Sequence, residues 1–104
     1  MPVFSINQLH TIADRILTSA GVPAEDASTV AEELAAANAV GHDSHGVMRL
    51  MQYVDLIRQE FVKPGAPVEV VRSGGSFTIF DANFNFGQVA ARKALETGLE
   101  QARA

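Results

Sequence analysis

The sequence predicts an α+β fold that is mainly helical, with three N-terminal helices, a small β-hairpin-like unit and one further helix. Apolar residues recur at helical spacing in four segments of the chain. Before the last of these segments, two short runs of β-branched and aromatic residues flank the turn-forming sequence Ser73-Gly74-Gly75-Ser76. The 104 residues suffice for one small domain, and the 47% hydrophobic content is ordinary for a chain with a packed core.

The first helix is predicted to begin at Ser5 and to end at Gly21. Ser5 and Gln8 have the spacing of a capping box, in which each side chain accepts a hydrogen bond from the other residue's backbone N–H. Gly21 stands where a left-handed residue commonly terminates a helix. The apolar positions between these ends are Ile6, Leu9, Ile12, Ala13, Ile16, Leu17 and Ala20.

The second helix is predicted to run from about Pro23, which suits a first helical turn, to near Gly41. Its apolar face is mostly alanine, which lets another backbone approach closely, so this helix is expected to pack against other helices. After a break at residues 42–43, a third helix is predicted from near Ser44 to about Gln59. Its buried stripe is expected to consist of Val47, Leu50, Met51, Val54 and Ile57.

Beyond Pro64 and Gly65, residues 68–71 and 77–80 are predicted to form the two strands of the hairpin. A following loop combines turn-forming residues with Phe84 and Phe86, which are expected to be exposed. Such a loop either covers a site or packs on a partner, and packing is the preferred interpretation. The last helix carries on one side Val89, Ala90, Ala94, Leu95, Leu99 and Ala102.

The organisation expected from these elements is a single segment, residues 1–104. Its helical part covers residues 1–62, and its strand-turn-strand unit and last helix cover residues 66–104. The last helix has no stop signal, because neither a glycine nor a proline follows it, and a sequence cut inside or just after an element has this appearance.

Composition excludes several classes of function. The net charge of −4 and the isoelectric point of about 5.2 leave no basic patch, so nucleic acid is not an expected partner. No apolar run is long enough to span a membrane, and no secretory signal opens the chain, so a cytoplasmic location is expected. The absence of cysteine excludes a disulfide scaffold, a thiolate nucleophile and a cysteine-bound metal.

Chemistry-bearing residues concentrate in residues 41–46, which hold two of the three histidines. If the third helix begins near Ser44, then His45, Arg49 and Tyr53 stand four residues apart on one helical face. Arginine offers a planar fork for a carboxylate, histidine exchanges a proton near neutral pH, and tyrosine supplies a hydroxyl. This set suits a small substrate that carries an oxyanion.

Structural interpretations of the same residues remain open. Asp43 or Ser44 is a normal helix N-cap, and Arg49 and Tyr53 could be solvated helix residues with packed stems. A hydrolase based on adjacent Ser and His is disfavoured, since no nucleophile-elbow sequence is present. A metal site at residues 42–45 is disfavoured as well, because the spacing matches no familiar ligand set, and no metal is expected.

The sequence resembles the type-2 malate/L-lactate dehydrogenases in one run of residues, Gly41-His42-Asp43-Ser44-His45-Gly46-Val47, followed by Arg49-Leu50, Tyr53 and Ile57. This family also includes ureidoglycolate, sulfolactate and diketogulonate dehydrogenases and the piperideine-2-carboxylate reductases. The flanking features agree in order, from the alanine-rich helix to Pro64-Gly65 and to Gly87-Gln88-Val89. The resemblance covers essentially the whole chain and implies the N-terminal segment of the malate/L-lactate dehydrogenase-like fold.

The resemblance implies hydride transfer between NAD or NADP and a small 2-hydroxy or 2-oxo acid, or a related imino acid. By the family's pattern Ser44 and His45 are catalytic residues, Arg49 binds the substrate carboxylate, and Tyr53 lines the same pocket. A bidentate arginine beside the reacting carbonyl would orient a 2-oxo acid for transfer. The family pattern also implies a homodimer.

Family members are roughly three times as long as this chain, and their cofactor-binding part lies mainly beyond the position of Ala104. Cofactor-binding residues are therefore expected outside this sequence, and residues 66–104 are expected to begin the cofactor domain. The chain alone is not expected to catalyse. The alternative hypothesis is a non-catalytic helical dimerisation or interaction module left by truncation.

Overall fold

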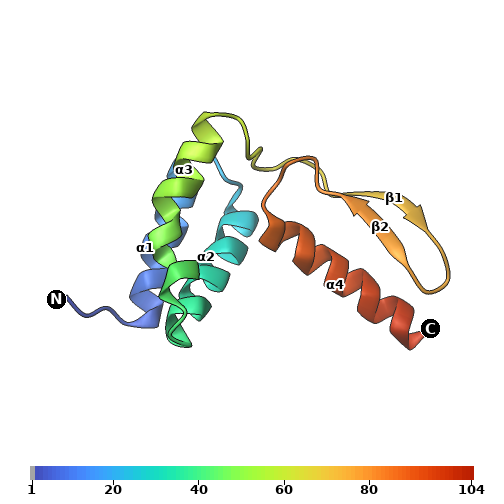
Figure 1. Cartoon of the computed structure of the whole chain (residues 1–104), viewed down its shortest axis with the longest axis horizontal. Helices are drawn as coiled ribbons and strands as arrows, with labels where there is room; N and C mark the ends of the chain where they lie inside the picture. Colours follow the sequence, from blue (N-terminus) through green and yellow to red (C-terminus); the bar gives the residue numbers. More distant parts are fainter. Residues whose placement is uncertain (1) are drawn as a thin grey trace.

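The computed structural model describes residues 2–104. Its elements in chain order are α1 (Ile6–Ser19), α2 (Ala24–Ala39), the 3-10 turns η1 (Asp43–His45) and η2 (Val47–Arg49), α3 (Leu50–Arg58), β1 (Glu69–Ser73), β2 (Thr78–Asp81) and α4 (Gly87–Arg103). Helices α1 to α3 form one group, while the hairpin and α4 extend to one side (Figure 1). The expected fold class, mainly helical α+β, is confirmed.

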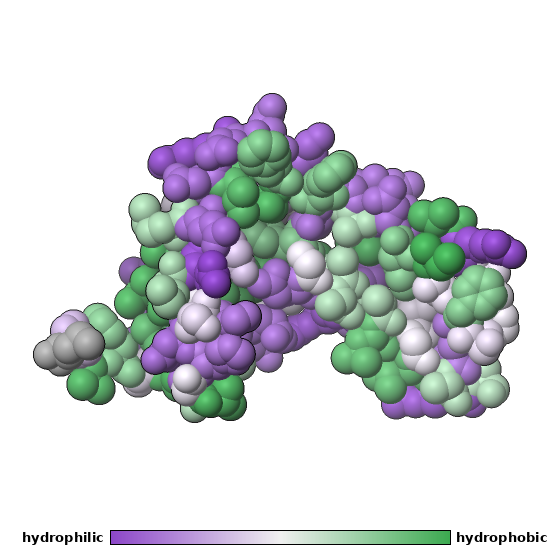
Figure 2. All heavy atoms as spheres, in the orientation of Figure 1, coloured by the Kyte–Doolittle hydropathy of each residue, from purple (hydrophilic) through white to green (hydrophobic). Residues whose placement is uncertain are grey.

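The chain is elongated, with principal extents of 51 × 30 × 21 Å and a radius of gyration of 15.1 Å. A compact domain of about 100 residues has a radius of gyration near 13 Å. The segment before α1 and the C-terminal end of α4 lie toward opposite ends of the long axis (Figure 1). Much apolar surface therefore stays open, and Figure 2 shows it over the hairpin and α4 as well as on the helical group.

Helix α1 begins and ends as its sequence predicts. The Ser5 hydroxyl accepts the Gln8 N–H at 3.1 Å, and the Gln8 side chain accepts the Ser5 N–H at 2.8 Å, which completes the capping box. Gly21 has a φ of +98°, a conformation that only glycine adopts without strain. Ala13 and Leu17 are fully buried, whereas Ile12 on the neighbouring face is 42% exposed.

Helix α2 forms the centre of the core through small side chains. Residues from α1, from α3 and from the connecting segments pack against its buried face. Together they form the core cluster of Ala13, Leu17, Val22, Ala27, Val30, Ala31, Leu34, Leu50 and Phe86. Pro23 precedes its first turn, and Gly41 follows its end with a φ of +79°. Packing of the alanine face against other helices is thus confirmed, chiefly against α1.

The predicted start of the third helix is wrong. Helix α3 begins at Leu50, and residues 43–49 form two 3-10 turns instead of helical continuation. The interruption is Gly46, whose φ of −94° and ψ of −153° are extended. One member of the expected buried stripe is also wrong, because Met51 is 69% exposed while Leu50 is 5% exposed.

Strands β1 and β2 pair antiparallel, as predicted for the hairpin. The register is irregular between Val70 and Arg72, which leaves a bulge in β1. The Gly74 N–H donates to the Phe77 carbonyl at 2.9 Å and closes the turn. Helix α4 is tied to this turn by the Gln101 amide, which donates to the Gly74 carbonyl at 2.9 Å.

The two phenylalanines of the loop between β2 and α4 differ in their exposure to solvent. Phe84 is 72% exposed as expected, but Phe86 is 3% exposed and belongs to the core, so its predicted exposure is wrong. The buried Asn85 explains the difference, because its side chain donates to the Ala66 carbonyl at 2.9 Å and accepts the Phe86 N–H at 2.7 Å. These bonds anchor the loop and direct the Phe86 ring inward.

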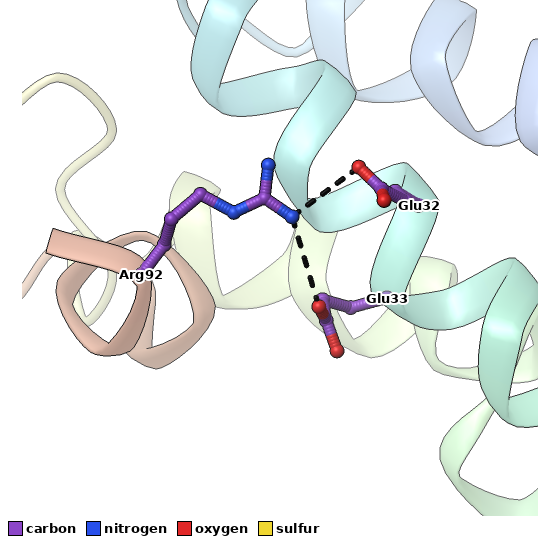
Figure 3. A network of polar contacts seen from close by, with 3 residues as sticks. All are labelled: Glu32, Glu33 and Arg92. Carbon is purple, nitrogen blue, oxygen red and sulfur yellow. Dashed lines mark hydrogen bonds and ion pairs between the residues drawn. The ribbon is translucent and has the colours of Figure 1, made fainter. Parts of the chain in front are cut away.

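Helix α4 buries none of its residues completely, and Leu95 and Leu99 are 62% and 46% exposed. Its side facing α2 carries Arg92, which reaches Glu32 at 3.2 Å and Glu33 at 3.9 Å (Figure 3). Within residues 2–104, no helix combines the length and the apolar character needed to cross a membrane.

Candidate functional site

The segment that carries His42 and His45 folds against the C-terminal end of α2. Gly41 reverses the chain with its positive φ, and the His42 N–H then donates to the Ala37 carbonyl at 2.8 Å. The His45 N–H donates to the His42 carbonyl at 3.0 Å, which forms the first 3-10 turn. Residues 41–45 are exposed to solvent, so the segment presents its polar side chains on the surface.

One side chain of α2 holds this segment at two points. The Asn38 Nδ2 donates to the Asp43 carboxylate at 2.9 Å, and the Asn38 Oδ1 accepts the Val47 N–H at 2.9 Å. Asp43 opens the first 3-10 turn and Val47 opens the second. Asn38 therefore connects both turns to the end of α2.

Gly46 lies directly against the same amide. A Cβ at this position would be 2.2 Å from the Asn38 Oδ1 and 2.5 Å from its Cγ, which is far inside van der Waals contact. Gly46 is buried, unlike the residues that precede it in the turn. The glycine is required here for close approach and not for a special φ.

Ser44, His45 and Arg49 are linked by side-chain contacts. The Ser44 Oγ lies 3.0 Å from the His45 Nδ1, and the Arg49 Nε donates to the Ser44 carbonyl at 2.7 Å. The Arg49 Nη1 donates to the Gln52 side chain at 2.8 Å. Arg49 thus uses two of its five N–H donors within residues 2–104, and its Nη2 group is free for an anion.

The predicted helical alignment of His45, Arg49 and Tyr53 is wrong, because His45 and Arg49 precede the first residue of α3. The cap hypothesis is wrong as well. Neither Asp43 nor Ser44 caps a helix with its side chain, since the Asp43 carboxylate is bound by Asn38 and the Ser44 hydroxyl lies against His45. The His45 ring also lies 4.1 Å from the ring of His42, measured between centroids.

Tyr53 lies in α3 but is bound from α4. Its hydroxyl accepts the Gln88 Nε2 at 3.0 Å, and its ring lies 5.5 Å from the ring of Phe86, between centroids. The structure therefore brings Ser44, His45 and Arg49 together and links Tyr53 to the first turn of α4 instead. Tyr53 is half-buried, and this link connects the helical group with α4.

Four grooves on the described residues include none of Ser44, His45 and Arg49 in their lining, and one of the four lies at the start of α1, beside Phe4. Another runs between α1 and α3 and is lined by Arg15, Ile16, Ser19, Ala20, Val54, Ile57 and Arg58. Two others lie between α2 and α4, around Arg92. Over residues 2–104, no three side chains of His, Asp or Glu come together in a way that could hold a metal ion.

Sequence reasoning missed the structural roles of Asn38 and Gln88. Asn38 is a lone amide near the end of an alanine-rich helix, and this isolation was the available signal. Gln88 was noticed only as part of the sequence that opens the last helix. Gln88 and Tyr53 are 35 residues apart, so their hydrogen bond could not be predicted from the spacing of neighbouring residues.

Residues 4–104 match the family described as malate/L-lactate dehydrogenase. The chain belongs to this family. It is 38% identical over 97 residues to a malate dehydrogenase of Pyrococcus abyssi, and the match covers 93% of this chain and 27% of that protein. It is 35% identical over 92 residues to an L-sulfolactate dehydrogenase of Methanothermobacter thermautotrophicus, covering 88% of this chain and 27% of the relative.

Solved structures of the family agree with the fold. The malate dehydrogenase of Pyrococcus horikoshii superimposes with a TM-score of 0.91 at 36% identity, over 94% of this chain and 28% of that one. The Δ1-piperideine-2-carboxylate reductase of Pseudomonas syringae superimposes with a TM-score of 0.90 at 30% identity, over 99% and 31% of the two chains. This malate/L-lactate dehydrogenase family member therefore spans under a third of the length of these relatives.

Proposed function

We propose that this chain is the N-terminal, substrate-side part of an NAD(P)-dependent 2-hydroxy-acid dehydrogenase. The observation that carries the proposal is the linked group of Ser44, His45 and Arg49 in a chain that belongs to the malate/L-lactate dehydrogenase family. Because the chain spans only about 27% of the P. abyssi relative, the activity is proposed for the whole protein and not for these residues alone.

His45 is proposed as the proton-exchanging group. Its Nδ1 faces the Ser44 hydroxyl at 3.0 Å, and its Nε2 has no hydrogen bond within residues 2–104. An imidazole held at one nitrogen presents the other in a defined direction, which suits proton exchange with a substrate hydroxyl. Ser44 orients that ring or holds the substrate oxygen.

Arg49 is proposed to bind the carboxylate of the substrate. Its Nε is fixed by the Ser44 carbonyl and one Nη1 hydrogen by Gln52, so the guanidinium plane is held while other donors remain. A fixed arginine can bind a carboxylate through two parallel N–H groups and so orient the neighbouring carbonyl. Tyr53, whose hydroxyl accepts from Gln88 here, is proposed to line the substrate pocket of the complete protein.

The nicotinamide cofactor, when bound, accepts a hydride from C2 of the 2-hydroxy acid, or donates one to C2 of the 2-oxo acid. In the oxidative direction the hydroxyl proton leaves to His45, and the C–O bond becomes a carbonyl. The described residues supply the groups that suit the substrate and contain no glycine-rich phosphate turn between strand and helix. Because the chain spans about 27% of the P. abyssi relative, we propose that the cofactor contacts lie outside this sequence and that residues 66–104 begin the cofactor domain.

The test is a chimera in which residues 4–104 replace the matched N-terminal residues of the P. horikoshii malate dehydrogenase. The purified chimera is assayed with NADH and with NADPH on a panel of 2-oxo acids. We expect turnover in the wild-type chimera and a loss of about 100-fold or more in kcat for His45→Ala. His10→Ala in α1 is the matched control and should leave kcat unchanged.

A chimera that folds and assembles like its parent but is inactive would contradict the proposal, as would full turnover of His45→Ala. The exposed apolar residues of α4, Leu95 and Leu99, favour a second function as an interaction module. Self-association of the 104-residue chain combined with an inactive chimera would support that second function. A homodimer is proposed for the complete protein.

A further inference from the structure

We propose that Asn38 is a positioning residue that fixes the conformation of the turn carrying Ser44 and His45. This inference rests on the proposed function, because the turn matters for catalysis only if His45 takes part in it. The contacts themselves are independent of that function. They place one amide group between the core and the candidate catalytic residues.

Asn38 continues the buried face of α2. It follows Leu34 by four residues, and Leu34 is 1% exposed. A leucine or alanine at position 38 would fit the pattern of the helix at least as well, since the rest of this face is apolar. Polar side chains that are removed from solvent are normally hydrogen-bonded. The presence of a half-buried amide at the end of an apolar face is therefore explained by its hydrogen-bond partners.

The two hydrogen bonds of Asn38 enclose the catalytic pair. The Nδ2 bond at 2.9 Å ends on Asp43, immediately before Ser44, and the Oδ1 bond at 2.9 Å ends on the Val47 amide, two residues after His45. Residues 44–46 are thus held at both ends by one rigid planar group. The planar amide fixes the separation of the two ends, and with it the backbone from which the Ser44 and His45 side chains project.

Gly46 makes this arrangement close-packed. Its missing side chain lets the backbone approach the amide so closely that a Cβ would be 2.6 Å from the Asn38 Nδ2. The Asn38 amide therefore occupies the space that a side chain at position 46 would need. A turn of exposed residues is thus held by a helix whose preceding turn, at Leu34 and Ala35, is buried in the core.

Arg49 is held more independently. It contacts Ser44 through its Nε, but it also contacts Gln52 in α3, and Leu50 beside it is buried in the core. Loss of Asn38 should therefore disturb His45 more than Arg49. In the complete enzyme this predicts a fall in kcat with a smaller change in KM for the 2-oxo acid.

The first arm of the test uses NMR on the 104-residue chain. Asn38→Ala is expected to raise the exchange rate of the Val47 amide about tenfold and to shift the His45 ring signals, while the Leu17 and Val30 amides keep their protection. Asn7→Ala, at an exposed position of α1, is the matched control and should change none of these signals.

A reciprocal swap supplies the rescue. In the double variant Asn38→Asp/Asp43→Asn, the new amide at position 43 donates to the new carboxylate at position 38, which still accepts the Val47 N–H. The swap should restore the Val47 exchange rate and the His45 signals to within about twofold of wild type. Asn38→Asp alone should fail to do so, because two carboxylates then face each other, whereas Asp43→Asn alone should stay near wild type, because its Oδ1 can still accept the Asn38 Nδ2.

The second arm measures kinetics in the chimera described above. Asn38→Ala should lower kcat about tenfold with KM changed less than about threefold, and the swap should restore kcat. Unchanged Val47 exchange and His45 signals in Asn38→Ala, or a swap that restores neither, would overturn the inference. An inactive wild-type chimera would count against the proposed function alone, because the NMR arm still decides the role of Asn38.

Discussion

Gly46→Ala is the substitution whose cost follows most directly from the structure. The added methyl group would lie 2.2 Å from the Asn38 Oδ1, so the amide must rotate away from the turn. Rotation breaks both Asn38 bonds and leaves the half-buried Val47 N–H unpaired. A buried donor without a partner costs about 1–3 kcal/mol, whereas the bond to exposed Asp43 contributes little.

We therefore expect Gly46→Ala to lower the free energy of unfolding by about 2 kcal/mol and Tm by about 10 °C. The assay is urea and thermal unfolding of the 104-residue chain, followed by far-ultraviolet circular dichroism. Gly98→Ala in α4 is the control, since a Cβ there meets nothing within 4 Å, and it should leave stability unchanged or raise it.

A double variant makes the reasoning refutable. Asn38→Ala removes the same two bonds that Gly46→Ala breaks, and it also removes the clash. Gly46→Ala/Asn38→Ala should therefore cost about as much as either single variant, and not their sum. Additive costs, or a Gly46→Ala chain within about 0.5 kcal/mol of wild type, would refute the account of this contact.

Three further substitutions test the fold by the same unfolding assay. Ser5→Ala removes the acceptor of the Gln8 N–H and should cost about 1 kcal/mol, so an unchanged midpoint would argue against the capping box as a stabilising contact. Phe86→Ala should cost about 3 kcal/mol or more, whereas Phe84→Ala should stay within about 0.5 kcal/mol, and equal effects would contradict their opposite burial. Arg92→Ala removes a pair whose side chains are 43% and 60% exposed, so a change above about 1 kcal/mol would be unexpected.

The features that the sequence predicts well are determined by neighbouring residues. The capping box needs only Ser5 and Gln8, and the positive φ at Gly21 needs only the end of a helix. The hairpin turn likewise depends on residues 73–76. Each of these features depends on residues that are close together in the sequence, so the local pattern is enough to predict it.

The start of α3 could not be predicted in this way. The apolar spacing from Val47 to Ile57 fits one continuous helix, and nothing local shows that Gly46 is extended. The cause is the Asn38 amide nine residues earlier, which binds the Val47 N–H and occupies the space beside Gly46. Tertiary contact thus overrides the helical pattern in the segment that carries the candidate site.

In the candidate site, too, the residue types can be recognised from the sequence, whereas the contacts between distant residues cannot. Ser44, His45 and Arg49 were found from residue type and family resemblance, and the structure brings them into contact through turns instead of a helical face. The bond from Gln88 to Tyr53 joins residues 35 positions apart and depends on how α4 docks. The catalytic and binding roles of these residues stay predictions.

The central claim is that His45 and Arg49 serve hydride transfer to C2 of a small 2-oxo acid. The most direct measurement is deuterium transfer in the chimera, using nicotinamide cofactor deuterated at the transferring carbon and mass spectrometry of the acid product. The account predicts a 2-hydroxy acid with deuterium at C2, formed by the wild-type chimera and nearly absent with His45→Ala. Product without deuterium, or equal deuterium transfer by His45→Ala, would contradict it.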